Sequence, residues 1–112
     1  MFDPVINEFH VIRERVTATD GYLRVKMLLV DGGMLECAEY VQRNAEGDIE
    51  LVTYARHWAN ANSELIMRWD NTPHFPDLPN FPDHVHDGSS GSVRSGVPMD
   101  IGMVLDEIAR KI

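Results

Sequence analysis

The apolar positions at the start of the chain follow a helical spacing. Five of them recur at steps of three and four residues, which places them on one stripe of a helix: Phe2, Val5, Phe9, Ile12 and Val16. The turn signal Asp20-Gly21 follows soon after this stripe. The pattern predicts an N-terminal helix over residues 1–19.

The pattern then changes to the alternation that is typical of strands. Four segments rich in Val, Leu, Tyr and Met are separated by short polar turns, at residues 22–30, 34–42, 49–58 and 64–70. Short turns between successive strands favour antiparallel neighbours. Residues 22–70 are therefore predicted to form a four-stranded antiparallel meander.

Alternation also predicts the two faces of this sheet. The apolar face, which the N-terminal helix would cover, collects Leu23, Val25, Met27, Leu29, Leu35, Cys37, Val41, Leu51, Ala55, Leu65, Met67 and Trp69. The polar face collects Arg24, Lys26, Tyr40, Tyr54, Arg56, Arg68 and Asp70. Tyr54 would then lie opposite Arg68, and Arg24 opposite Tyr40. Four of the ten basic residues share the polar face, which is either an ordinary solvated surface or a binding surface for an anion.

A proline-rich segment follows the sheet at residues 71–98. It holds five of the six prolines, and four of these recur at every third residue: Pro73, Pro76, Pro79 and Pro82. Because three residues per turn is the period of polyproline II, we expect an extended strap. The strap either packs back on the domain through its aromatic edge or is a ligand for an aromatic groove in another protein. Apolar spacing then predicts a second amphipathic helix over residues 99–112.

These elements predict one α+β domain of 112 residues: an N-terminal helix, a four-stranded antiparallel meander sheet, an extended Pro/His-rich strap and a C-terminal helix. The formal net charge of −8 disfavours nucleic acid as a partner unless a local basic patch binds it. The single cysteine, Cys37, excludes an internal disulfide and fits a reducing compartment. We find no secretory signal and no apolar run of membrane-spanning length, and therefore expect a cytoplasmic protein with no membrane partner.

Four of the five histidines lie between positions 57 and 86. His84 and His86 are two residues apart, so on an extended chain both would point the same way and could bind a metal ion. A rigid polyproline strap would hold His74 about 30 Å away from them. The third ligand would then come from Asp70 or His57.

Two other interpretations of these histidines remain open. One is general acid–base catalysis, with arginines holding an anionic substrate. The other is that the histidines only fix the strap by hydrogen bonds. Because we find no Cys-rich or zinc-protease pattern, we expect no metal and no cofactor in the purified protein. Cys37, on the core-facing register of its strand, is expected to be a buried and unreactive thiol.

Three stretches of the chain carry a resemblance to a known family: YARHW at 54–58, LIMRWDNTPH at 65–74 and FPDHVH at 81–86. Over residues 20–110 the chain resembles the TumE family of toxins. The resemblance implies the toxin of a type II toxin–antitoxin pair, encoded beside a helix-turn-helix antitoxin and loosely grouped with RelE- and ParE-like toxins. The chain departs from the family pattern at Asp83, often a second histidine, at Arg56, often an aromatic residue, and in the Ser/Gly-rich stretch 88–96.

A helix followed by a four-stranded meander is also the order of elements in RelE-like, metal-independent ribonucleases. Such enzymes need few groups, because RNA carries its own nucleophile, the 2′-OH. We therefore predict a metal-independent endoribonuclease with the catalytic residues Arg68, Asp70, His57, His74, His84 and His86. The substrate-binding residues would be Arg24, Lys26, Tyr54, Arg56 and Trp58, with Arg56 and Arg68 clamping phosphate and Trp58 stacking a base.

The alternative is a non-enzymatic interaction module that inhibits a partner through its basic sheet face and its Pro-rich strap. The expected partners are a helix-turn-helix antitoxin protein, RNA or ribosome-associated mRNA, and a second copy of the chain in a homodimer. Total RNA after induction of the protein would distinguish the two functions.

Overall fold

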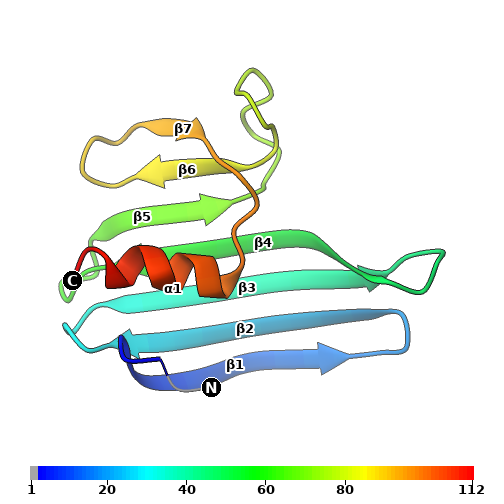
Figure 1. The fold of residues 1–112 in the computed structure, drawn as a ribbon, viewed down its shortest axis with the longest axis horizontal. Helices are drawn as coiled ribbons and strands as arrows, with labels where there is room; N and C mark the ends of the chain where they lie inside the picture. Colours follow the sequence, from blue (N-terminus) through cyan, green and yellow to red (C-terminus); the bar gives the residue numbers. More distant parts are fainter. Residues whose placement is uncertain (1–2) are drawn as a thin grey trace.

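The computed structural model describes residues 3–112 as one seven-stranded antiparallel sheet with a single short helix (Figure 1). The strands are β1 (Ile6–Val16), β2 (Asp20–Leu29), β3 (Met34–Arg43), β4 (Ile49–Ala59), β5 (Leu65–Asp70), β6 (His84–Asp87) and β7 (Val93–Ser95), and the helix is α1 (Ile101–Ala109). Each strand pairs with its neighbours in the sequence, so the order in the sheet is β1 to β7 without a crossover. The chain forms a meander, and α1 lies across it.

Short turns with local hydrogen bonds separate the predicted strands. In the β2–β3 turn, Gly32 has a φ of +88°, and the N–H of Gly33 donates to Asp31 Oδ1 at 2.9 Å. In the β4–β5 turn, Asn60 Oδ1 accepts from the N–H groups of Asn62 and Glu64. Because these hydrogen bonds join residues only two to four positions apart, the turns can be recognised in the sequence. The strands β2 to β5 therefore begin and end within two residues of the predicted segments.

One face of the sheet is covered by α1 across its middle strands, and we call it the helix-covered face (Figure 1). The buried apolar residues of this face and of the helix form one cluster: Val5, Val25, Met27, Leu29, Leu35, Cys37, Tyr54, Trp58, Met67, Trp69, Val85, Val104, Leu105 and Ile108. Asp100 caps α1 by accepting from the N–H of Met103 at 2.8 Å. The opposite face, which we call the open face, has no helix over it in residues 3–112.

The predicted N-terminal helix is wrong, because residues 6–16 form the edge strand β1, paired with β2. Phe2, one member of the predicted stripe, lies outside the described residues. Val5 is buried in the core cluster, whereas Phe9, Ile12 and Val16 are exposed, so these four residues do not form one buried stripe. The segment is rich in β-branched residues, which favour strands.

Two irregularities in the β1–β2 pairing explain why the strand did not show a period of two. The register shifts between Ile6 and Glu8 and again between Val11 and Arg13. An extra residue reverses the alternation of the residues that follow it, so the apolar residues of β1 imitate a helical spacing. The fold class α+β with a four-stranded sheet is therefore wrong, and so is the helix-then-meander order that suggested a RelE-like fold.

The predicted polyproline strap is also wrong. Its second half forms β6 and β7, which extend the sheet, and the predicted helix over 99–112 is shorter, at Ile101–Ala109. Its first half is a chain of turns: Leu78 N–H donates to Phe75 O, Phe81 N–H to Leu78 O, and Asp83 N–H to Asn80 O. Polyproline II has no internal hydrogen bonds, and Asn80 has a φ of +63°, which reverses the chain direction. The segment therefore folds back and returns the chain to β5.

The predicted faces are right for β2, β3 and most of β5 but wrong for most of β4. Leu51 pairs with Val41, but Tyr40 pairs with Thr53, so Val52 is an extra residue in β4. This bulge reverses the alternation. As a result Tyr54, Arg56 and Trp58 lie on the helix-covered face, and His57 joins the open face.

The same pairing corrects two predicted neighbours. Arg24 pairs with Ala38 rather than Tyr40, and Arg68 pairs with His57 rather than Tyr54.

The helix α1 is too short to cross a bilayer, and no helix among residues 3–112 is long and apolar enough to do so.

Candidate functional site

Two rows of paired residues cross the open face. The first row runs from β2 to β6 through Lys26, Glu36, His57, Arg68 and His86. The second row runs through Arg24, Ala38, Ala55, Asp70 and His84. Because paired residues on one face are close neighbours, the β5–β6 pairing brings the most polar ends of the two rows together.

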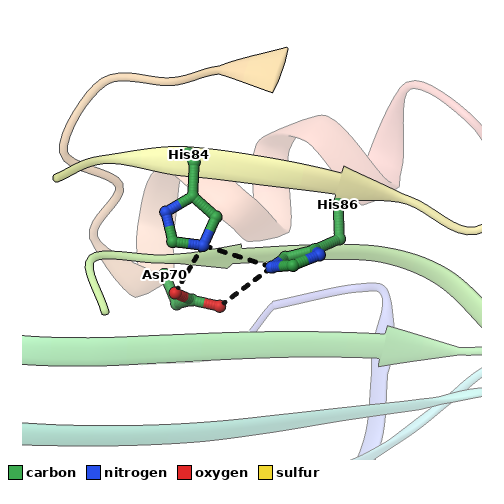
Figure 2. Close-up of side chains that lie close together, drawn as sticks. All are labelled: Asp70, His84 and His86. Carbon is green, nitrogen blue, oxygen red and sulfur yellow. Dashed lines mark hydrogen bonds and ion pairs between the residues drawn. The ribbon is translucent and has the colours of Figure 1, made fainter. Parts of the chain in front are cut away.

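Asp70, His84 and His86 form a tight cluster at this place, which we call the His–Asp cluster (Figure 2). His84 Nε2 lies 2.9 Å from Asp70 Oδ1 and 3.1 Å from His86 Nε2, and His86 Nε2 lies 3.6 Å from Asp70 Oδ2. His84 and Asp70 are only 2% and 3% exposed, whereas the side chain of His86 is 31% exposed. The cluster is therefore buried on one side and reaches solvent at His86.

A backbone carbonyl orients the His84 ring and determines that its Nδ1 is a donor. His84 Nδ1 lies 2.8 Å from Pro82 O, and because a carbonyl oxygen only accepts, Nδ1 carries the proton. The other ring nitrogen, Nε2, then faces Asp70 and His86. A carboxylate and two ring nitrogens thus converge on one point.

The Asp70 carboxyl is held in its ionised form. Burial alone would raise its pKa, but hydrogen bonds from the Thr72 backbone N–H at 3.0 Å and from Arg68 Nε at 3.0 Å, with the nearby positive charge, hold the pKa below its ordinary value. Asp70 therefore carries a negative charge at neutral pH in a nearly buried position.

Arg68 links the His–Asp cluster to His57. Its Nε donates to Asp70 Oδ2 and its Nη1 lies 3.3 Å from His57 Nδ1. Burial, together with the Arg68 charge, lowers the pKa of His57, so its neutral ring accepts from the guanidinium. The Arg68 side chain is still 37% exposed, which leaves an oriented guanidinium available to a ligand.

Phe75 covers the two histidine rings from the folded-back segment. Its ring centroid is 4.9 Å from that of His84 and 5.9 Å from that of His86, both edge-on. The neighbouring His74 is exposed and packs edge-on against Phe75. The predicted 30 Å separation of His74 from the pair is therefore wrong, because it assumed a rigid strap.

The comparison with protein families agrees with the motifs around this cluster. The family model described as toxin TumE matches residues 3–112. The chain belongs to the TumE toxin family. The predicted resemblance is thereby confirmed over nearly the whole described chain, and membership of a toxin family implies an antitoxin as partner. No curated protein and no solved structure matches the chain.

In this TumE chain the predicted site residues divide between the two faces. Arg68, Asp70, His57, His84, His86, Arg24 and Lys26 lie on the open face, with His74 on the adjoining loop. Arg24 forms an ion pair with Glu36, in which Arg24 Nη1 lies 3.0 Å from Glu36 Oε2. Neither Glu36 nor Phe75 was among the predicted residues, although alternation from Lys26 across the short turn would have placed Glu36 on the same face.

The three residues of β4 on the helix-covered face are part of the core. Trp58 stacks on Trp69 with ring centroids 6.5 Å apart, and Tyr54 O–H donates to Asp83 Oδ1 at 2.7 Å. Burial and the hydrogen bond to Asp83 raise the pKa of Tyr54 far above its usual value, so it stays neutral. Arg56 is fully buried and binds Glu39 and the Met99 carbonyl. None of the three reaches the open face of the TumE chain.

The free thiol of this TumE protein is expected to be unreactive in the folded state. Cys37 is buried, and burial raises its pKa to about 12, so almost no thiolate is present at pH 8. An aromatic disulfide reagent at pH 8 should label Cys37 only after denaturant unfolds the protein. Rapid and complete labelling of the native protein would contradict this placement.

Proposed function

We propose that this TumE toxin is an endoribonuclease that cleaves RNA on the open face of its sheet. The observation that carries the proposal is the exposed Arg68 guanidinium, oriented by Asp70 on one side and by His57 on the other. Catalysis of this reaction needs little machinery, because RNA supplies its own nucleophile in the 2′-OH.

Arg68 is the group we assign to the phosphate. A guanidinium binds phosphate oxygens through paired N–H donors, and a held guanidinium loses less freedom when it does so. Arg24 and Lys26 lie on the same face three strands away on β2, along the same two rows. They would support the RNA backbone on one side of the cleaved bond, which gives an acidic protein the local basic patch that RNA requires.

His57 is the group we assign to proton transfer at the cleaved bond. It is half-buried and lies beside Arg68 in the first row. When the Arg68 guanidinium turns to the phosphate, Nδ1 of the neutral His57 ring is released and can accept the proton of the 2′-OH as the new bond to phosphorus forms. His74, on the exposed loop near the His–Asp cluster, is the most exposed of the imidazoles in this region and can donate a proton to the leaving 5′-oxygen.

Substitution of Arg68 tests the proposal. With a labelled single-stranded RNA and purified protein, Arg68→Ala is expected to lower the cleavage rate about 100-fold or more, because charge stabilisation at the phosphorus is lost. Arg68→Lys should recover part of the rate, since it keeps the charge but not the paired donors.

Arg94→Ala is the matched control, because Arg94 is an exposed arginine on β7 whose ion pair with Asp87 is far weaker than a buried one. It pairs with Val85, on the helix-covered face, and its loss should leave the rate unchanged. Equal cleavage by wild type and Arg68→Ala, or RNA that stays intact with the wild type, would refute the proposal.

A non-enzymatic toxin that inhibits by occupying a partner is the second candidate. The large apolar side chains exposed on the edge strand β1, among them Phe9, Val11, Ile12 and Val16, favour it because such an edge suits a protein partner. Growth arrest with intact total RNA, retained in Arg68→Ala, would favour this candidate over the nuclease. We also propose that the antitoxin is of the helix-turn-helix type.

A further inference from the structure

We propose that Asp70, His84 and His86 bind one divalent transition-metal ion, Zn²⁺ in the first place, with one coordination position left open. The site is a property of the fold and does not depend on the proposed nuclease activity. The sequence alone led us to expect no metal, because it shows no Cys-rich or zinc-protease pattern.

The spacing of the ligand atoms fits a tetrahedral ion. His84 Nε2 lies 2.9 Å from Asp70 Oδ1 and 3.1 Å from His86 Nε2, and His86 Nε2 lies 3.6 Å from the other carboxylate oxygen, Asp70 Oδ2. Ligands bound at about 2.0–2.1 Å to a tetrahedral zinc ion are about 3.3 Å from one another. Movements of a few tenths of an ångström would therefore place both ring nitrogens and one Asp70 oxygen around one ion.

The directions of the acceptor atoms at the cluster also suit a cation. With Nδ1 of His84 donating to Pro82 O, the Nε2 atoms of His84 and His86 and a carboxylate oxygen of Asp70 face one another. One metal ion can accept a lone pair from each of these three groups.

The surroundings of the ligands are those of a metal site. The Pro82 carbonyl fixes the ring of His84, and the Thr72 N–H and Arg68 fix the carboxylate of Asp70. Such outer hydrogen bonds orient ligands and set the His tautomer in zinc proteins. Here they also leave Nε2 of His84 free for the ion.

The ligand set and its exposure decide the class of metal and site. Two imidazole nitrogens and one carboxylate oxygen suit zinc and related transition metals rather than Ca²⁺ or Mg²⁺, which prefer oxygen ligands. Three protein ligands with an open position are typical of zinc sites that bind a water molecule or an exogenous ligand. The exposed side of His86 and the neighbouring Arg68 guanidinium mark the side from which such a ligand would enter.

Metal titration of the purified protein tests the site. The protein should be prepared without a histidine tag, freed of metal with a chelator, and titrated with Co²⁺ and with Zn²⁺. We expect one equivalent to bind, Co²⁺ to give the visible absorption bands of a tetrahedral site, and Zn²⁺ to raise Tm by several degrees, since it binds only the folded state. Absence of binding at micromolar metal would overturn the proposal.

Variants separate this site from adventitious binding by imidazole. His86→Gln is the key variant, because His86 is partly exposed and its loss leaves the buried Asp70–His84 contact in place. It should weaken Zn²⁺ binding at least 100-fold with a circular dichroism spectrum like that of the wild type.

His10→Gln is the matched control, since His10 is an exposed histidine on β1, and its Zn²⁺ affinity should equal that of the wild type. Unchanged binding by His86→Gln, or equal losses in the two variants, would overturn the proposal. Neither result depends on RNA cleavage, so a failure of the nuclease assay leaves this test intact.

Discussion

Replacing Arg56 by alanine is expected to lower the free energy of unfolding by about 3–5 kcal/mol, as is typical when one partner of a buried ion pair is removed. Arg56 is 0% exposed on the helix-covered face. Its Nη2 donates to Glu39 Oε2 at 3.0 Å, and its Nε donates to the carbonyl of Met99 at 3.2 Å. Urea denaturation followed by circular dichroism measures the change.

The size of this effect has a clear structural reason. Met99 immediately precedes the N-cap of α1, so Arg56 ties the approach to the helix to β4 as well as holding Glu39 of β3. Alanine leaves a cavity, an unpaired carboxylate and an unsatisfied carbonyl together. The same substitution therefore weakens the packing of the only element that covers this face in residues 3–112.

Arg24→Ala is the matched control for the buried arginine. Arg24 also pairs with a glutamate of β3, Glu36, at 3.0 Å, but both side chains are more than a third exposed. Exposed ion pairs of this kind contribute about 0–1 kcal/mol. A loss below about 1 kcal/mol for Arg56→Ala, similar to that of Arg24→Ala, would show that Arg56 is not structural.

Gly88→Ala is expected to destabilise the protein by about 2–3 kcal/mol. The Ser/Gly-rich composition around Gly88 would by itself suggest a loop in which substitutions have little effect. A Cβ at this position would lie 1.8 Å from the carbonyl oxygen of Leu65 and 2.5 Å from its carbonyl carbon. Backbone atoms cannot turn aside as a side chain can. Thermal unfolding should show the loss as a drop in Tm of several degrees.

The same substitution should disturb the His–Asp cluster. Gly88 follows β6 directly, and its N–H donates to Ile66 O at 3.0 Å. To make room for a methyl group, β6 must shift away from β5, which separates His86 from Asp70.

Gly102→Ala, in the first turn of α1, is the control. Its Cβ meets only ordinary contacts, and alanine in a helix is favoured by about 0.5–1 kcal/mol, so Tm should hold or rise. Equal Tm values for both variants would contradict the close approach at Gly88.

The strands β2 to β5 could be predicted because their signals are local. Alternation and turn residues such as Asp31-Gly32-Gly33 act within a few positions, and the structure adds little to them. The family could be predicted for the same reason, since its motifs are short and contiguous. By contrast, one extra residue at Val52 reverses the faces of Tyr54 and Arg56, and no pattern in a single strand announces a bulge.

The candidate site could be predicted in its parts but not in its assembly. The spacing of His84 and His86 indicated that both point the same way, and Asp70 was a candidate third ligand. Their meeting depends on the pairing of Asp70 with His84 across β5 and β6, which exists only because residues 71–83 fold back through turns. The proline periodicity instead predicted a stiff, extended segment, because prolines report only the local preference for φ. The fold-back depends on backbone hydrogen bonds donated by Leu78, Phe81 and Asp83, which the periodicity does not reveal.

The order of elements along the chain has a consequence for biosynthesis. Each strand pairs with the strand made just before it, so the sheet can grow hairpin by hairpin as the polypeptide leaves the ribosome. The helix α1, which covers Trp58 and Leu35, follows all seven strands. Throughout synthesis the nascent sheet therefore presents an uncovered apolar face, the kind of surface that chaperones bind and that aggregates at high concentration. A product whose translation stops before residue 101 would keep that face exposed and would be prone to aggregate.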